Sequence, residues 1–214
     1  MPRPTTAGRT RGADGGELAA ALDHAAELAA SREALVLVEG PSDRAAVESL
    51  AARRGRDLAA ERVAVIDTGG ATNIGHFLGR LARLSDRVTL AGLCDEAEVR
   101  FIAGGLERAG YGRVLDRDDL GAFGFFVCVA DLEDELIRAL GVAGVEEVIA
   151  GQGELGSLRL FQNQVAQRDR APEDQLHRFM GTRSMRKIRY AALLAEALDL
   201  ARMPQPLAAL LDRV

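Results

Sequence analysis

Acidic side chains follow each of four short apolar runs in the first two thirds of the chain. They are Glu39, Asp67, Asp95 and the pair Asp131 and Glu133. Carboxylates that gather in one place repel each other and raise one another's pKa unless a cation neutralises them. Oxygen ligands suit Mg²⁺ or Mn²⁺, and an ion held in this way can also bind a phosphate and activate the attacking hydroxide in phosphoryl transfer. The alternative is that each carboxylate only caps the helix that follows it.

The apolar runs predict how these carboxylates come together. The runs span residues 34–38, 63–66, 88–94 and 123–129, and an amphipathic stretch follows each of them. They lack the alternation of apolar and polar residues that marks a strand with one exposed face, which indicates a parallel sheet covered on both sides. Ligands of such sheets bind beyond the carboxyl ends of the strands. We therefore predict an α/β fold with a four-stranded, Rossmann-like parallel sheet and the carboxylates along one rim.

Helices are expected over most of the remaining chain. The predicted helices span 17–30, 42–54, 73–84, residues 95 to about 109, residues 131 to about 140, 146–150, 155–165 and 184–201, and a last short helix follows Pro206. The polar stretch 116–121 is predicted to be a loop, because it lacks apolar periodicity. No further strand is expected beyond residue 140.

The chain has the length of one ordinary domain with extensions, at 214 residues. The segment 1–16 is rich in Gly, Thr and Arg, and we predict a disordered tail there. A helix over 17–32 then precedes the core of the fold at 33–141. A helical region over 142–214 is expected to pack on that core.

Composition points to a globular protein of the cytoplasm. Apolar residues make up 48% of the chain and charged residues 28%, and no apolar run approaches the roughly 20 residues that a membrane span requires. The N-terminal segment lacks the apolar stretch of a secretory signal. Cys94 and Cys128 both lie within apolar runs, which predicts reduced thiols in the core.

The charge pattern singles out one residue. A net charge of −5 argues against a protein coated with nucleic-acid-binding surface. Arginine accounts for 26 of the 27 basic residues, so that Lys187 is the single lysine of the chain. An ammonium is a compact donor that fits beside a metal-bound phosphate, whereas a guanidinium is broad and planar. A lysine left on the surface by chance is the alternative.

Three motifs together resemble a known family. They are LVLVEGPSD at 35–43, IDTGG at 66–70 followed by Asn73, and LCDEAE at 93–98. Their combination resembles the Toprim module, in the form found in the OLD (overcoming lysogenization defect) family of endonucleases. The resemblance covers roughly residues 34–140, and its OLD-like features extend into the C-terminal helices.

The resemblance implies a role for each acidic position. Glu39, also a catalytic residue by this comparison, and Asp43 would help to hold one metal ion. Asp95 would be a further ligand, and Asp131 with Glu133 would serve a second ion. The cofactor implied is Mg²⁺ or Mn²⁺.

One position departs from the family's pattern. The third-strand motif is Asp-x-Asp, and its second aspartate corresponds to Ala97 in this chain. Glu96 and Glu98 are the acidic neighbours that could substitute, although at a helix start they point in different directions. We include Glu98 among the predicted metal ligands.

The resemblance also implies a basic catalytic residue on a later helix that stabilises the transition state or the leaving group. Lys187 is in the matching place, and Arg183, Arg186 and Arg189 around it could contact flanking phosphates. Each arginine taken alone is equally a solvated helix residue.

The expected function is a Mg²⁺- or Mn²⁺-dependent nuclease or related phosphotransfer enzyme acting on the backbone of DNA or RNA, with DNA favoured over RNA. The alternative, motivated by Ala97, is a catalytically degenerate Toprim module that binds metal or nucleic acid within a repair or defence complex. The chain contains no G-x-x-x-x-G-K-[ST] motif, so we expect a stand-alone module whose ATPase, where one is needed, is a partner in trans. A homodimer is compatible with this interpretation, and no membrane partner is expected.

Two other site types are disfavoured. His24, His76 and His177 are scattered without the spacing of zinc ligands, so we do not expect a zinc site. No G-x-G-x-x-G follows the first predicted strand, which disfavours a nucleotide-binding or phosphatase-like domain.

Overall fold

The computed structural model describes residues 15–84, 87–114 and 116–214. The predicted N-terminal tail therefore lies almost wholly outside the described residues. Its last two residues, Gly15 and Gly16, already belong to the first helix, α1 (Gly15–Ala29).

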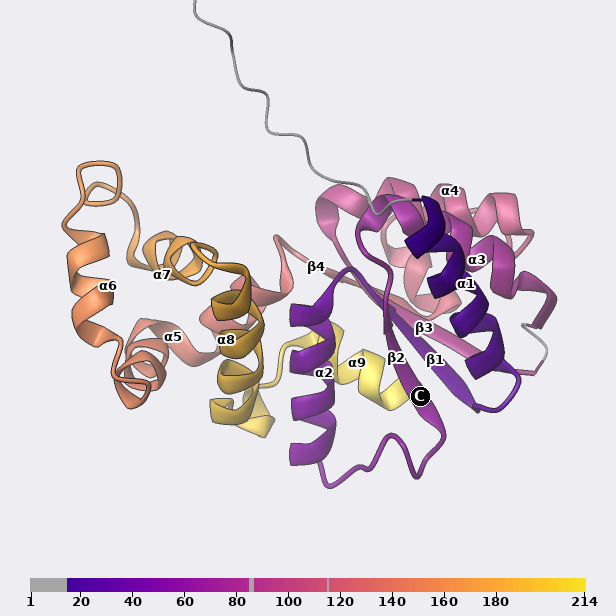
Figure 1. Ribbon diagram of the computed structural model, residues 1–214, viewed down its shortest axis with the longest axis horizontal. Helices are drawn as coiled ribbons and strands as arrows, with labels where there is room; N and C mark the ends of the chain where they lie inside the picture. The colour runs from indigo at the N-terminus through magenta and orange to yellow at the C-terminus, as the bar shows by residue number, and fades with distance from the viewer. Residues whose placement is uncertain (1–14, 85–86, 115) are drawn as a thin grey trace, which may run out of the picture.

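A parallel sheet of four strands forms the centre of the fold (Figure 1). The strands are β1 (Ala34–Val38), β2 (Val63–Asp67), β3 (Thr89–Asp95) and β4 (Phe125–Cys128), in the order β2-β1-β3-β4. All three neighbouring pairs are parallel, which confirms the predicted fold class. Gly92 in β3 is required by close packing, because a Cβ there would lie 2.6 Å from the Phe125 ring and from the Leu37 carbonyl oxygen.

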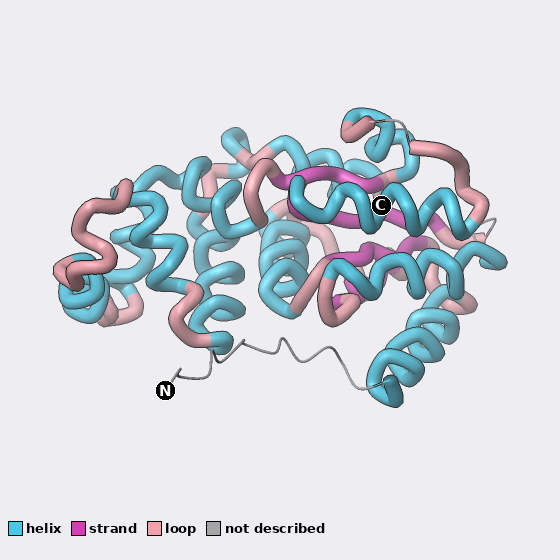
Figure 2. Tube along the Cα trace, turned by 90° about the horizontal axis from the view of Figure 1, so that it is seen from above, coloured by secondary structure: helices cyan, strands magenta, loops and turns pink. Residues whose placement is uncertain are grey.

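Helices cover both faces of the sheet, and Figure 2 shows the strands between them. One apolar cluster unites α1, α3 (Ile74–Leu81) and α4 (Val99–Ala109) with side chains such as Leu35 and Leu37 of β1. The other unites α2 (Pro41–Arg53), α8 (Ser184–Ala197) and α9 (Gln205–Arg213) with Val36 and Val38 of the same strand. Successive β1 residues therefore face opposite apolar layers, which is why the strand is apolar throughout.

The C-terminal helices extend the fold to one side of the sheet (Figure 1). They begin with α5 (Leu132–Gly151), in which Gly141 leaves helical geometry at φ 73° and ψ 163°. The predicted boundary between core and helical region falls on this kink, although the division itself stays a prediction. Next come α6 (Leu155–Gln162) and α7 (Pro172–Met180), and α8 returns the chain to lie against α2.

Several element predictions were wrong in detail. The stretch predicted to be a loop is largely a 3₁₀ helix, η4 (Asp118–Phe123). The separate helix expected at 146–150 is the second half of α5, and the helix predicted to reach residue 201 ends at Ala197. The helix α7 was not predicted, although Pro172 at its first turn is a usual helix start. The remaining short 3₁₀ segments are η1 (Ala71–Asn73), η2 (Ala82–Leu84), η3 (Glu96–Glu98) and η5 (Leu200–Arg202).

The predicted core thiols are confirmed as buried and free, since Cys94 and Cys128 are 4% and 1% exposed. Among the described residues, no helix combines the length and apolar character that crossing a membrane requires.

Candidate metal centre

The first group of potential metal ligands lies where β1 and β3 end. It consists of Glu39, Asp95 and Glu98, each of which places one carboxylate oxygen within 4.8 Å of the others. Glu39 follows β1, Asp95 is the last residue of β3, and Glu98 closes the short turn that leads into α4. The two strands are adjacent and parallel, so their carboxyl ends meet at one rim of the sheet.

Local capping decides which acidic neighbour of Ala97 faces this group. The backbone N–H of Asp95 donates to Oε2 of Glu98 at 3.4 Å, within a capping box at the helix start. Glu96 instead forms an ion pair with Arg117 at 3.0 Å. The carboxylate missing at position 97 is thus compensated in space by Glu98 and not by Glu96.

Asp43 lies in the first turn of α2, close to the same rim. Its Oδ2 accepts a hydrogen bond of 2.9 Å from the backbone N–H of Gly40, which fixes the carboxyl group. Burial, followed by the negative charge of Glu133, raises its pKa from 3.8 to about 7. The two groups of ligands are therefore close enough to act on one another through Asp43.

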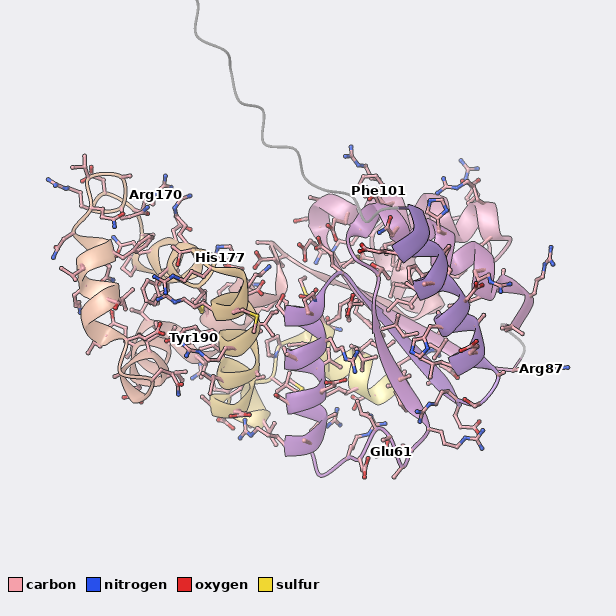
Figure 3. All side chains as sticks on the ribbon, in the orientation of Figure 1. Glu61, Arg87, Phe101, Arg170, His177 and Tyr190 are labelled. Carbon is pink, nitrogen blue, oxygen red and sulfur yellow. The ribbon has the colours of Figure 1, made fainter. Side chains whose placement is uncertain are left out.

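The second group consists of Asp131, Glu133 and His177, again with ligand atoms within 4.8 Å of one another. Asp131 caps α5, since its Oδ1 accepts the backbone N–H of Asp134 at 2.8 Å. Its Oδ2 lies 2.6 Å from Nε2 of His177. Figure 3 shows His177 on α7, outside the sheet. The group thus joins the end of the sheet to the C-terminal helices.

Glu133 is the most unusual member of this group. It is only 2% exposed, and neither of its carboxylate oxygens has a hydrogen-bond partner among the described residues. The ammonium of Lys187 on α8 lies 3.3 Å from its Oε2, which is an ion pair without hydrogen-bond geometry. A buried carboxylate without directed partners is costly, so its oxygens are suited to a cation.

The electrostatics of the rim also fit a divalent cation. Burial and then the charge of Glu98 raise the pKa of Asp95 to about 8, and Asp131 contributes to the same rise. Burial and the charge of Glu39 raise the pKa of Glu98 to about 7. Carboxyl groups held this close together cannot all ionise at neutral pH without a positive charge among them. The donor set, mostly carboxylate oxygens, is the kind that Mg²⁺ or Mn²⁺ binds.

Two groups near Glu133, namely Lys187 and Asp131, are instead stabilised in their charged forms. Burial lowers the pKa of Lys187, but the carboxylates of Glu133 and Asp43 outweigh it, so that the pKa is raised overall. Burial raises the pKa of Asp131, but the hydrogen bonds from His177 and from the Asp134 N–H outweigh it and lower the pKa. Lys187 is therefore held as a cation and Asp131 as an anion.

The three arginines predicted to bind nucleic acid differ in their surroundings. Arg186 and Arg189 both form ion pairs with Glu154, and the Arg186 guanidinium also stacks 4.3 Å from the centre of the Phe179 ring. These contacts attach α8 to the start of α6. Arg183 is exposed and precedes α8.

Asp67 does not join the rim cluster. It ends the edge strand β2 and lines a groove of about 840 Å³ with residues of α1 and α2, and it belongs to neither ligand group of the described residues. Asp67 thus ends at the same edge of the sheet, beside Val38 of β1, but outside the two ligand groups.

A second cavity, of about 620 Å³, opens directly onto the second ligand group. Its wall includes Glu133, His177 and Lys187, together with Phe161 of α6 and Thr182.

His177 was missed at the level of sequence. It lies 46 positions from Asp131, and no linear spacing joins the two. The available signal was the helix start at Pro172-Glu-Asp, which predicts α7 but not the direction of its imidazole.

Comparisons with known proteins agree with this geometry. Residues 32–95 match the model of the family "Overcoming lysogenization defect protein-like, TOPRIM domain". This segment is therefore similar to an OLD-like Toprim domain. It contains Glu39, Asp43 and Asp95, and so includes most of the first ligand group.

The likeness to solved structures extends over most of the chain. The C-terminal region of the Xanthomonas campestris pv. campestris OLD protein superposes with a TM-score of 0.67 at 25% identity, covering 86% of this chain and 92% of that one. The C-terminal region of the Burkholderia pseudomallei OLD protein gives 0.63 at 19% identity, covering 85% and 96%. The helices after the Toprim sheet are thus part of the shared fold. No relative was found among curated protein sequences.

Proposed function

We propose that this protein is a Mg²⁺- or Mn²⁺-dependent nuclease that hydrolyses phosphodiesters of DNA. The observation that carries the proposal is the buried Glu133, whose carboxylate lies between the acidic rim and the ammonium of Lys187. The OLD-like Toprim match and the two ligand groups support it.

The residues divide into two sets of ligands. Glu39, Asp95 and Glu98 would hold one ion with help from Asp43, while Asp131 and Glu133 would hold a second. Bound divalent ions polarise a phosphate and lower the pKa of water, so that hydroxide forms near neutral pH. The negative charge of this rim would repel a polyanion, and so the protein itself offers the phosphate few direct contacts there.

Lys187 supplies the direct contact in this proposal. Its side chain is 43% exposed, so the ammonium reaches both the buried Glu133 and the cavity beside it. An ammonium in that position stabilises negative charge that develops on the phosphate or on the leaving oxygen. The exposed Arg183 near the start of α8 is the predicted contact for a neighbouring phosphate, because Arg186 and Arg189 are already paired with Glu154.

The alternative of a degenerate, non-catalytic module was motivated by Ala97. The position of Glu98 weakens that motive, because it supplies a carboxylate to the group that contains Glu39 and Asp95. The preference for DNA over RNA, an ATPase partner in trans and a homodimer stay predictions.

The decisive experiment follows cleavage of supercoiled plasmid and single-stranded DNA with Mg²⁺, with Mn²⁺ and with EDTA. We expect metal-dependent cleavage that is lost in Glu39→Gln and retained in Glu48→Gln, a control on the exposed side of α2. RNA and a small phosphomonoester test the substrate class. Equal cleavage by the Glu39→Gln protein would assign the activity to a contaminant, and metal binding without cleavage by the unaltered protein would favour the degenerate module.

A further inference from the structure

The second ligand group contains a nitrogen donor that the acidic rim lacks. His177 brings Nε2 to 2.6 Å from Oδ2 of Asp131, and one of its ring nitrogens lies within 4.8 Å of a carboxylate oxygen of Glu133. Adjacent ligands of an octahedral ion with bonds of about 2.1 Å stand about 3 Å apart, and opposite ones about 4.2 Å apart. The three side chains therefore need only small adjustments to share one ion.

Glu133 gives an independent reason to expect a cation here. Glu133 is 2% exposed and its carboxylate has no hydrogen-bond partner among the described residues, while Lys187 lies 3.3 Å from its Oε2. By contrast, Asp131 is satisfied through both oxygens, by the Asp134 N–H and by His177. Nε2 of His177 and Oδ2 of Asp131 already lie 2.6 Å apart, so a cation bound between them would replace this direct contact.

We propose that His177 is a ligand of the ion held by Asp131 and Glu133, and that its imidazole makes this site select a divalent transition ion such as Mn²⁺ over Mg²⁺. Mg²⁺ takes oxygen ligands and keeps much of its water, whereas imidazole is a ligand of transition ions. The first group, Glu39 with Asp95 and Glu98, offers oxygen alone and has no such preference. The inference rests on the proposed metal sites but not on cleavage.

The location of His177 makes this site accessible. The His177 side chain is 40% exposed and lines the cavity of about 620 Å³ that also contains Glu133 and Lys187. An ion held at the wall of this cavity would retain open positions toward it. The helix α7 thus supplies a ligand from outside the OLD-like Toprim segment matched at residues 32–95.

Pulsed electron paramagnetic resonance on the full chain with Mn²⁺ tests the inference directly. We expect a ¹⁴N coupling to bound Mn²⁺ that changes to a ¹⁵N coupling when the histidines are ¹⁵N-labelled, and that disappears in His177→Asn. His76→Asn is the matched control and should retain the signal. Absence of any nitrogen coupling in the unaltered protein at saturating Mn²⁺ overturns the proposal, whether or not the variants fold.

Calorimetric titration separates ligation from mere orientation of Asp131. His177→Asn should weaken Mn²⁺ binding at one site by about tenfold or more and change Mg²⁺ binding much less. An equal loss for both ions means that His177 only positions Asp131, and the proposal fails. Cleavage is measured separately: nitrogen coupling without cleavage rejects the nuclease function alone, and cleavage without nitrogen coupling rejects the ligand role alone.

Discussion

The sheet rim and the C-terminal helices contribute to the candidate centre in different ways. The rim supplies carboxylates whose positions follow from parallel topology, since Glu39 and Asp95 end neighbouring strands. The helices supply Lys187 and His177, whose positions follow from the packing of α8 on α2 and of α7 on α5. The sheet therefore supplies the carboxylates that are proposed to bind metal, while the helices supply the basic and imidazole side chains that act beside them.

Glu133 is the point at which the two regions meet. It lies in the first turn of α5, just after β4, and its charge acts on both Asp43 of the rim and Lys187 of α8. If the comparison is right, loss of Lys187 should reduce turnover, whereas loss of a rim carboxylate should reduce metal binding, and His177 is the helical residue whose loss should also affect metal binding.

The largest effect is expected from Lys187→Met. Removal of the ammonium should lower the rate of cleavage by about 10²- to 10³-fold, as for other charge-stabilising donors, with metal affinity reduced much less. Single-turnover cleavage and calorimetric titration of Mn²⁺ measure the two quantities. Arg183→Ala, on the same segment, should cost less than tenfold.

A stability measurement keeps that prediction interpretable. Lys187→Met removes the ammonium that pairs with the buried Glu133, which can destabilise the fold. The midpoint of thermal unfolding is therefore compared with that of the unaltered protein, with metal present. Lys187→Arg retains the charge but changes its shape, and should recover only part of the rate. Full activity in Lys187→Met would remove the helical region from the proposed chemistry.

Asp95 and Asp67, which end β3 and β2, allow two strand-end carboxylates to be compared for their effect on metal binding. Asp95→Asn should weaken metal binding by about 10- to 100-fold, because Asp95 lies in the first ligand group. Asp67→Asn should leave metal affinity unchanged, because Asp67 lines the groove beside β2 instead. Titration of both proteins with Mn²⁺ is the test, and equal losses would mean that all strand ends share one site.

The behaviour of these two aspartates shows what sequence patterns can and cannot predict. The apolar runs predict the parallel sheet, and the resemblance in the three motifs predicts Glu39, Asp43 and Asp95 as rim residues. The pattern does not give the strand order, in which β2 is an edge strand whose terminal Asp67 belongs to neither ligand group of the described residues. The pattern also does not predict in which direction an acidic side chain points within a turn. Here the capping box between Asp95 and Glu98 brings Glu98 to the site.

The helical region is harder to predict for a physical reason. Helix periodicity identifies a buried face, but the partner of an exposed polar residue depends on loops and crossing angles that have no period in sequence. Lys187 was found because it is the single lysine and because of the family resemblance. His177 had neither signal, and only the packing of α7 brings it to Asp131.

The acidic rim should also make stability depend on pH when no metal is bound. The pKa values of Asp43, Asp95 and Glu98 are raised from 3.8, 3.8 and 4.5 to about 7, 8 and 7 in the folded protein. The folded state therefore binds protons more tightly than the unfolded state, so the stability from these groups is present below about pH 4 and is lost as the pH rises to about 8.

Thermal melting in EDTA should therefore give a lower midpoint at about pH 8 than at about pH 5.5, by several degrees. Saturating Mn²⁺ should raise the midpoint more at the higher pH, because the ion binds ionised carboxylates. Asp95→Asn should reduce the decline seen in EDTA. A midpoint in EDTA that does not fall over this range would contradict the crowding of these groups.

The smallest effect is expected from Glu154→Gln, which tests how the helices hold Lys187. Glu154 precedes α6 and pairs with Arg186 and Arg189 on either side of Lys187, and it accepts a hydrogen bond from Tyr190 at 3.3 Å. Ion pairs of this partly exposed kind contribute only about 0.2–1 kcal/mol each, so the fold should persist.

The expected consequence of Glu154→Gln is a looser α8 and a cleavage rate lower by roughly threefold to tenfold, with metal affinity unchanged, because small displacements of a catalytic group slow the reaction. Glu146→Gln is the matched control, since it removes an ion pair of 2.6 Å with Arg159 that does not involve α8. Similar rates in both variants would show that the backbone packing of α8 against α2, and not Glu154, positions Lys187. A loss of metal affinity in Glu154→Gln would instead show that the rim and the helices are not separable, and the contrast between binding and turnover would fail.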